Sequence, residues 1–220
     1  LGTITNYSSP VQTSTALQWK SLATNPFGTN LITIDSSNNG YISGSNSYGQ
    51  LGISTTITIS SPVTITSSQK LDATGKQAMD NNTQFVINNS GYLFAAGNNA
   101  NGNLGLGNTV DRSQLTQIGN QTYWKQVSIS SAIDNTGRLF TCGYNALGQL
   151  GLGDITNRSS LVQVGLLTNW KNISCGYQAS YAIKTDGTLW GWGQNSSSNI
   201  NPSATNISSP IQIGTSTNWS

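Results

Sequence analysis

The chain has 220 residues, of which only 7% are charged, and it has no histidine and a formal net charge of +2. Ordinary soluble proteins carry roughly 25% charged residues, so a surface rich in Asn, Ser, Thr, Gln and Gly is expected here. Nine Lys and Arg give no basic field for counterion release, and no apolar run approaches the ~18 residues of a membrane span, so we expect neither nucleic-acid binding nor membrane insertion.

A hairpin pattern recurs along the chain at intervals of about fifty residues. Each predicted hairpin ends in a glycine: Gly44, Gly97, Gly143 and Gly193. Each also contains a turn residue that tolerates positive φ: Asn38, Gly91, Gly137 and Gly187. In the last hairpin, Asp186-Gly187 predicts a tight two-residue turn with positive φ at both positions.

Three of the hairpins are followed by the pattern Gly-x-Leu-Gly, then a polar loop and an extended strand. The pattern occupies Gly49–Gly52, Gly102–Gly105 and Gly148–Gly151. The extended strands start at Pro10, Pro62, Gln114, Leu161 and Pro210. We therefore predict one array over 1–220, with units at 10–52, 62–105, 114–151 and 161–200 and partial repeats at both ends.

Short strands in units of about fifty residues, without helical periodicity, are typical of propeller blades. The segments WKNIS (170–174), TDGTLWGWG (185–193) and YNALGQLGLGD (144–154) resemble the regulator of chromosome condensation repeat family. We expect an all-β propeller of four-stranded blades with negligible helix. About four blades are covered, and the resemblance implies a longer propeller, usually of seven blades.

The sequence departs from the family pattern in three places. The histidine that the family usually has between the Trp-Lys pair and the hairpin is absent. Gln194–Asn199 replaces Gly-x-Leu-Gly in the last unit. In the third unit Trp124 lies 13 residues before Gly137, whereas Trp170 lies 17 residues before Gly187. We expect this deficit to remove most of a strand after Ser128, through a natural deletion or residues missing from the sequence.

Both ends of the sequence fall in the middle of a repeat. Leu1–Pro10 resembles the segment that starts at Leu51, and Trp219 stands where Trp170 opens a strand. We therefore expect a piece of a longer array that does not close into a ring alone, with apolar faces near Val11 and Trp219. Such faces require further blades or adjacent copies in a homo-oligomer or larger assembly.

The inventory of reactive side chains is small. Cys142 and Cys175 occupy positions held by Trp192 and Met79 in other units, so buried thiols are expected in preference to a disulfide. Two cysteines without histidine form no usual zinc site, and no histidine is present to act as a general base. We expect no enzymatic activity, no cofactor and no metal site.

The family resemblance implies three kinds of use. One is a guanine-nucleotide exchange factor that also docks on chromatin, another is a secreted inhibitor of an enzyme, and the third is a surface array of microbes or viruses. Few charges and a neutral polar exterior favour a non-enzymatic binding or structural module that is secreted, cell-surface or virion-associated. The exchange factor and the secreted inhibitor are the alternatives. A protein partner is expected at polar loops around Asn99, Asn101, Tyr144 and Asn145.

Overall fold

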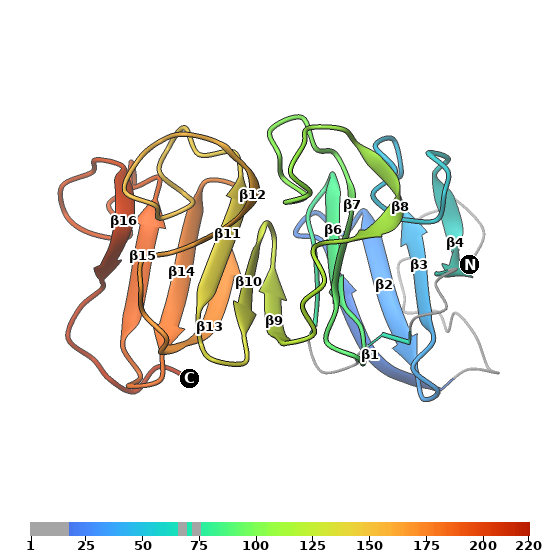
Figure 1. Ribbon diagram of the computed structural model, residues 1–220, viewed down its shortest axis with the longest axis horizontal. Helices are drawn as coiled ribbons and strands as arrows, with labels where there is room; N and C mark the ends of the chain where they lie inside the picture. Colours follow the sequence, from blue (N-terminus) through green and yellow to red (C-terminus); the bar gives the residue numbers. More distant parts are fainter. Residues whose placement is uncertain (1–17, 66–69, 72–75) are drawn as a thin grey trace, which may run out of the picture.

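The computed structural model describes residues 18–65, 70–71 and 76–220, and within them sixteen strands form four antiparallel sheets and no helix occurs. The first blade contains β1 (Trp19–Thr24), β2 (Asn30–Asp35), β3 (Gly40–Gly44) and β4 (Ile59–Thr64). The second contains β5 (Gln77–Met79), β6 (Thr83–Ile87), β7 (Leu93–Gly97) and β8 (Arg112–Gln117). The third contains β9 (Trp124–Ser128), β10 (Ser131–Asp134), β11 (Leu139–Gly143) and β12 (Arg158–Gln163). The fourth contains β13 (Trp170–Cys175), β14 (Ala179–Lys184), β15 (Leu189–Gly193) and β16 (Ile207–Gln212) (Figure 1).

The sheets are offset from the predicted units. Pro62 lies in β4, which pairs with β3 through Ile42 and Val63, so the extended strand completes the preceding blade. The same holds for β8, β12 and β16. Pro10 and Val11, and with them the first extended strand, lie outside the described residues.

The first strand of each blade lies at the inner edge of the array, where β1 contacts β5, β5 contacts β9 and β9 contacts β13. Apolar residues of one blade pack against the next. Ile133 and Leu139 of the third blade, for example, share a buried cluster with Trp170 and Ile173 of the fourth. Successive blades therefore complete one another's cores.

The aromatic residues at one hairpin position support these clusters from their edges. Phe140 and Trp190 are half-buried and make edge-to-face contacts with Trp124 and Trp170 of their own blades, at ring-centroid distances of 5.4 and 6.1 Å. Each packs against an inter-blade cluster.

The hairpins turn at the predicted residues, with φ of 63° at Asn38, 81° at Gly91, 82° at Gly137 and 79° at Gly187. The predicted two-residue turn at Asp186-Gly187 is wrong, because only Gly187 has positive φ. The N–H of Gly187 donates to the Lys184 carbonyl (2.9 Å), and the N–H of Lys184 donates to the Thr188 carbonyl (3.0 Å). This pattern is a three-residue loop, in which a turn is followed by one left-handed residue.

The third blade keeps all four strands despite its shorter sequence. Ile129 and Ser130 alone join β9 to β10, and Ser130 adopts φ of 53°. The expected loss of a strand after Ser128 is therefore wrong, because the deficit shortens the hairpin at its tip. In the fourth blade the corresponding loop, 176–178, joins a longer pair of strands.

Candidate functional site

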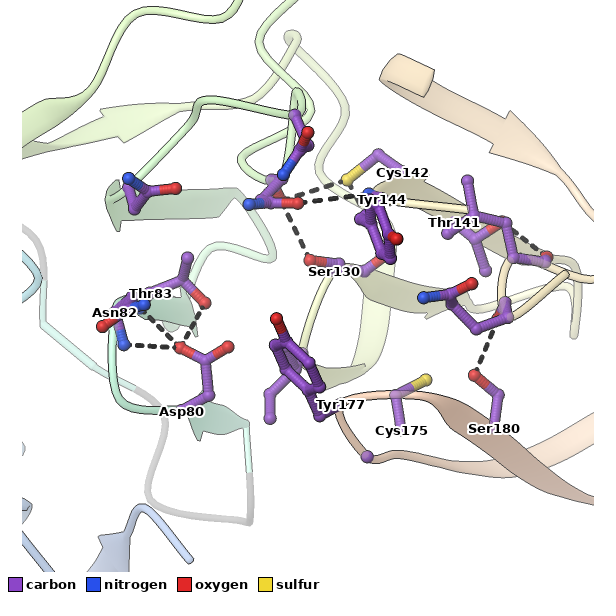
Figure 2. A pocket seen from close by; sticks show the side chains of 17 residues that line it. Asp80, Asn82, Thr83, Ser130, Thr141, Cys142, Tyr144, Cys175, Tyr177 and Ser180 are labelled. Carbon is purple, nitrogen blue, oxygen red and sulfur yellow. Dashed lines mark hydrogen bonds between the residues drawn. The ribbon is translucent and has the colours of Figure 1, made fainter. Parts of the chain in front are cut away.

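One end of the array carries the loops that join first to second strands and third to fourth strands in every blade, and we call it the loop face (Figure 1). A cavity of about 340 Å³ opens there between the second, third and fourth blades, and we call it the axial cavity. Its lining includes Asp80 and Thr83 of the second blade, Ser130 and Tyr144 of the third, and Tyr177 of the fourth (Figure 2). The short β9–β10 hairpin forms part of the wall.

Within the part of the chain that the structure describes, Asp80 is the one charged side chain that lines the axial cavity. Its Oδ1 accepts hydrogen bonds from the N–H of Asn82 (2.8 Å), the N–H of Thr83 (2.6 Å) and the Thr83 hydroxyl (2.9 Å). These bonds fix the carboxylate at the start of the loop between β5 and β6. The other carboxylate oxygen, Oδ2, has no hydrogen-bond donor among the described residues and is directed toward Tyr177 in Figure 2.

Two tyrosines stand at the opening of the cavity. Tyr177 lies in the loop between β13 and β14 and is 83% exposed, and Tyr144 follows β11 and is 39% exposed. The Tyr144 N–H donates to Asn103 Oδ1 (3.2 Å), which links the third blade to a loop of the second. Tyr177 lies next to Asp80 in Figure 2, and Tyr144 lies farther from it on the other side of the cavity.

The cysteines are free thiols in the wall of the axial cavity. Burial raises the pKa of both thiols, for Cys175 against hydrogen bonds from serine residues that lower it. The Cys142 Sγ donates to the Asn103 carbonyl (3.3 Å), and the Cys175 Sγ lies 3.1 Å from the Ser131 hydroxyl. Neither is an activated nucleophile. Among the described residues no group of three or more His, Cys, Asp or Glu could hold a metal ion, and no helix is suited to crossing a membrane.

The four residues predicted to bind a partner separate into two pairs. Asn101 and Tyr144 line the axial cavity and are exposed. Asn99 and Asn145 are fully buried. The prediction that they contact a partner is therefore wrong, because their side-chain amides hold the loops together. In the third blade, the Asn145 Nδ2 donates to the carbonyls of Asp154 (3.0 Å) and Thr156 (3.1 Å), and its Oδ1 accepts from the Leu150 N–H (2.9 Å).

Every blade has this buried asparagine, at Asn46, Asn99, Asn145 and Asn195. The last blade keeps the arrangement although it lacks Gly-x-Leu-Gly, since the Asn195 Oδ1 accepts from the Ile200 N–H (2.8 Å). Ser198, with φ of 54°, provides the left-handed position there.

The loop face concentrates exposed apolar side chains from all four blades. They are Phe27, Tyr48, Ile57, Val110, Tyr144, Ile155 and Tyr177. Charged side chains on these loops form ion pairs and hydrogen bonds within their own loop. Arg158, for instance, pairs with Asp154 (2.5 Å) and also donates to the Thr156 carbonyl (2.8 Å). Apolar side chains among neutral polar loops are typical of a protein-binding surface.

The repeats match known family models. Residues 136–183 and 170–198 match two models described as the regulator of chromosome condensation (RCC1) repeat. The chain resembles the regulator of chromosome condensation repeat family, and residues 136–198 match its models. It is 36% identical over 174 residues to the X-linked retinitis pigmentosa GTPase regulator of Canis lupus familiaris, which covers 79% of this chain and 13% of that protein. The Mus musculus protein of the same name is 38% identical over 78 residues, 36% of this chain and 8% of that protein. The chain thus spans a small part of these relatives.

Solved structures show the same fold. Human WBSCR16 matches with a TM-score of 0.78 and 16% identity over 92% of this chain and 54% of its own chain. Prp20p from Saccharomyces cerevisiae matches with a TM-score of 0.77 and 16% identity over 94% of this chain and 52% of its own chain. These likenesses confirm the predicted all-β propeller of four-stranded blades, about four of which the chain covers.

Proposed function

We propose that this chain is part of a non-enzymatic propeller that binds a small GTPase through its loop face. The observation that carries the proposal is the 36% identity over 174 residues to a protein named a GTPase regulator. The structure of Prp20p, a more distant likeness, was described together with its binding to Gsp1p and histones. These likenesses favour the alternative of the exchange-factor type over the secreted, cell-surface or virion-associated module, for which the low charge and neutral polar exterior were the argument.

The loop face supplies the chemistry that a protein partner needs. Exposed apolar residues such as Tyr144, Ile155 and Tyr177 lie among amides and hydroxyls, so they can be desolvated without uncovering unpaired charge. Arg158 and Asp154 are already paired within a loop. We therefore expect the affinity to depend only weakly on ionic strength, since few free charges take part.

The proposal assigns no reaction to the chain itself. The sequence has no histidine, and burial raises the pKa of both cysteine thiols. Any effect on a GTPase would then come from binding, which favours one nucleotide state of the partner over another.

Biolayer interferometry with the purified chain tests the proposal. The partners are small GTPases prepared without nucleotide, with GDP or with a non-hydrolysable GTP analogue, and release of a fluorescent GDP analogue is followed in parallel. We expect binding that discriminates between nucleotide states. Replacing Tyr144 and Ile155 together by serine should weaken binding about tenfold or more.

The matched control replaces Leu166 and Leu167 by serine. Both are exposed at the opposite end, between β12 and β13. This control should bind as the unmodified chain does. Absence of binding to the panel in any nucleotide state, or an equal loss in the control, would refute the proposal.

A further inference from the structure

We propose that the axial cavity receives an arginine side chain presented by the protein partner, with Asp80 as its counter-ion and Tyr144 and Tyr177 as its stacking surfaces. This assignment rests on the proposed function, because it names what the partner inserts at the loop face. It follows from the shape, charge and aromatic content of the cavity.

The cavity lies beside a short hairpin, and we infer that this shortness leaves room for it. The β9–β10 connection has two residues, Ile129 and Ser130, whereas the corresponding connection in the fourth blade has three, 176–178, and joins longer strands. The missing tip leaves about 340 Å³ open to the loop face. That volume is at the small end for ligand sites, and it accommodates one long side chain.

The charge of the cavity selects a cation. Among the described residues, Asp80 is its one charged lining residue, and no Lys or Arg lines it. Three hydrogen bonds to Oδ1 hold the carboxylate in place, while Oδ2 remains without a donor among the described residues. A cation that reaches Oδ2 gains a charge-assisted hydrogen bond to an acceptor that is already oriented.

The aromatic rings favour a planar cation. Figure 2 shows Tyr177 beside Asp80 and Tyr144 across the same opening. The face of a phenol ring attracts a cation, and a guanidinium group also stacks on it through its flat surface. Arginine satisfies the carboxylate and the rings together, whereas an anion would be repelled by Asp80.

One buried amide in the cavity wall also has an unpaired donor. Gln149 lines the cavity and is 7% exposed, and its Nε2 is buried without an acceptor. Its Oε1 accepts from the Leu147 N–H (3.0 Å), so the Nε2 end is the free one. An unpartnered buried donor is costly, so this amide is a second polar group of the cavity wall, beside Asp80, with unused hydrogen-bonding capacity.

The direct test uses Nα-acetyl-L-arginine N-methylamide as the probe, followed by NMR titration of the 220-residue chain. The neutral comparison is the citrulline derivative, which has nearly the same shape without the charge. We expect the arginine probe to bind with a Kd of about 1 mM and to shift resonances of Tyr144 and Tyr177. The citrulline derivative should bind at least about tenfold more weakly.

Asp80→Asn keeps an Oδ1 acceptor for the loop and removes the charge, so it should weaken the arginine probe about tenfold with little change in Tm. The matched control is Asp186→Asn, at the opposite end, where Asp186 Oδ1 also accepts from a following threonine, Thr188 (2.9 Å from its N–H). The control should bind the probe normally. Equal binding of the two probes, or an unchanged Kd in Asp80→Asn, would overturn the assignment.

A second measurement separates this inference from the proposed function. If Asp80→Asn loses the probe but binds the GTPase normally, the partner does not use the cavity, and the inference fails while the proposed function stands. If the unmodified chain binds the probe but no GTPase, the proposed function fails. The cavity then still binds arginine, but a GTPase is not the partner that presents it. A parallel loss of probe and partner in Asp80→Asn supports both.

Discussion

At Gly187 the backbone is left-handed, with φ of 79°, and a side chain at this position would meet the carbonyl of Thr217. Gly91 and Gly137 approach the carbonyls of Thr122 and Thr168 in the same way. The turn glycine of a blade is therefore needed both for its φ and for the close passage of the segment that leaves the blade.

The contribution of that close passage can be measured by comparing two alanine variants. Gly214 has φ of 64° and no atom within 4 Å of its hypothetical Cβ, so Gly214→Ala adds backbone strain alone. We expect this variant to lose about 1 kcal/mol in the free energy of unfolding. Gly187→Ala should lose about 2 kcal/mol or more, because the segment at Thr217 must also move. Urea denaturation measures both losses, and equal losses would contradict the role of the contact.

The stability of the third hairpin turn depends on pH through the carboxyl group of Asp134. Burial alone would raise the pKa of this carboxyl, but hydrogen bonds from the Arg138 N–H (3.0 Å) and Thr136 outweigh that effect, and the pKa lies below the ordinary value of 3.8. Because the folded pKa is below the unfolded one, the stabilisation is complete above the unfolded pKa. It is lost as the pH falls through the folded pKa.

We expect Asp134→Asn to cost about 1 to 2 kcal/mol at pH 7, since the ion pair with Arg138 is lost while the turn persists. Asn88 occupies the same position in the second blade and accepts from the N–H groups of Ser90 and Tyr92, so the variant should fold. Urea midpoints from pH 7 down to about 2.5 should show the difference between the two proteins shrinking below the ordinary aspartate pKa. A difference that stays constant with pH would refute this linkage.

At the scale of the element, the short β9–β10 hairpin is what opens the axial cavity. Inserting Gly-Tyr-Gln-Ala between Ile129 and Ser130 copies residues 176–179 of the fourth blade and should lengthen the hairpin into the cavity. We expect at least about a tenfold loss of arginine-probe affinity with little change in Tm, because hairpin tips tolerate insertion. The same insertion after Gly119, in the β8–β9 connection at the opposite end, serves as the control. Unchanged probe binding in the first insertion would show that this hairpin does not shape the site.

The elements that the sequence predicted best are those fixed by local chemistry. Positive-φ residues located the four turns, and the Gly-x-Leu-Gly pattern located the loops after the third strands. The turn type at Asp186 was missed, since Asp186 Oδ1 accepts from the Thr188 N–H (2.9 Å) and hydroxyl (2.6 Å) in the observed turn. Polar character alone also failed to separate buried Asn99 and Asn145 from exposed Asn101.

Asp80 and Tyr177 were missed for a different reason. They belong to separate units and meet only when the blades wrap around the axis, so no pattern within one repeat connects them. The available signal was the four-residue deficit in the third unit. That deficit predicts the loss of most of a strand after Ser128, but the sequence alone does not say whether a hairpin loses its residues from a strand or from its tip.

At the scale of the whole molecule, each blade finishes the core of its neighbour. Ile133 and Leu139 of the third blade are buried because the fourth blade covers them. The equivalent residues of the fourth blade, Ile183 and Leu189, are half-exposed, and so is Tyr181, two residues before Ile183 in the same strand. Solved propellers of this fold extend to about twice the length of this chain, since the chain covers 54% of one and 52% of another. A further blade of the same kind is the expected cover for this face.

We therefore expect the isolated 220-residue chain to self-associate through that face, because a second copy is the available substitute for the next blade. Light scattering coupled to size exclusion should show a mass that rises with concentration. Ile183→Lys should return the chain to a monomer, since it places a charge on the face without removing a buried side chain. Leu166→Lys, at a residue that is 92% exposed at the opposite end, should leave the association unchanged. A monomer at all concentrations with a cooperative thermal transition would show that four blades are sufficient and that the face around Ile183 needs no cover.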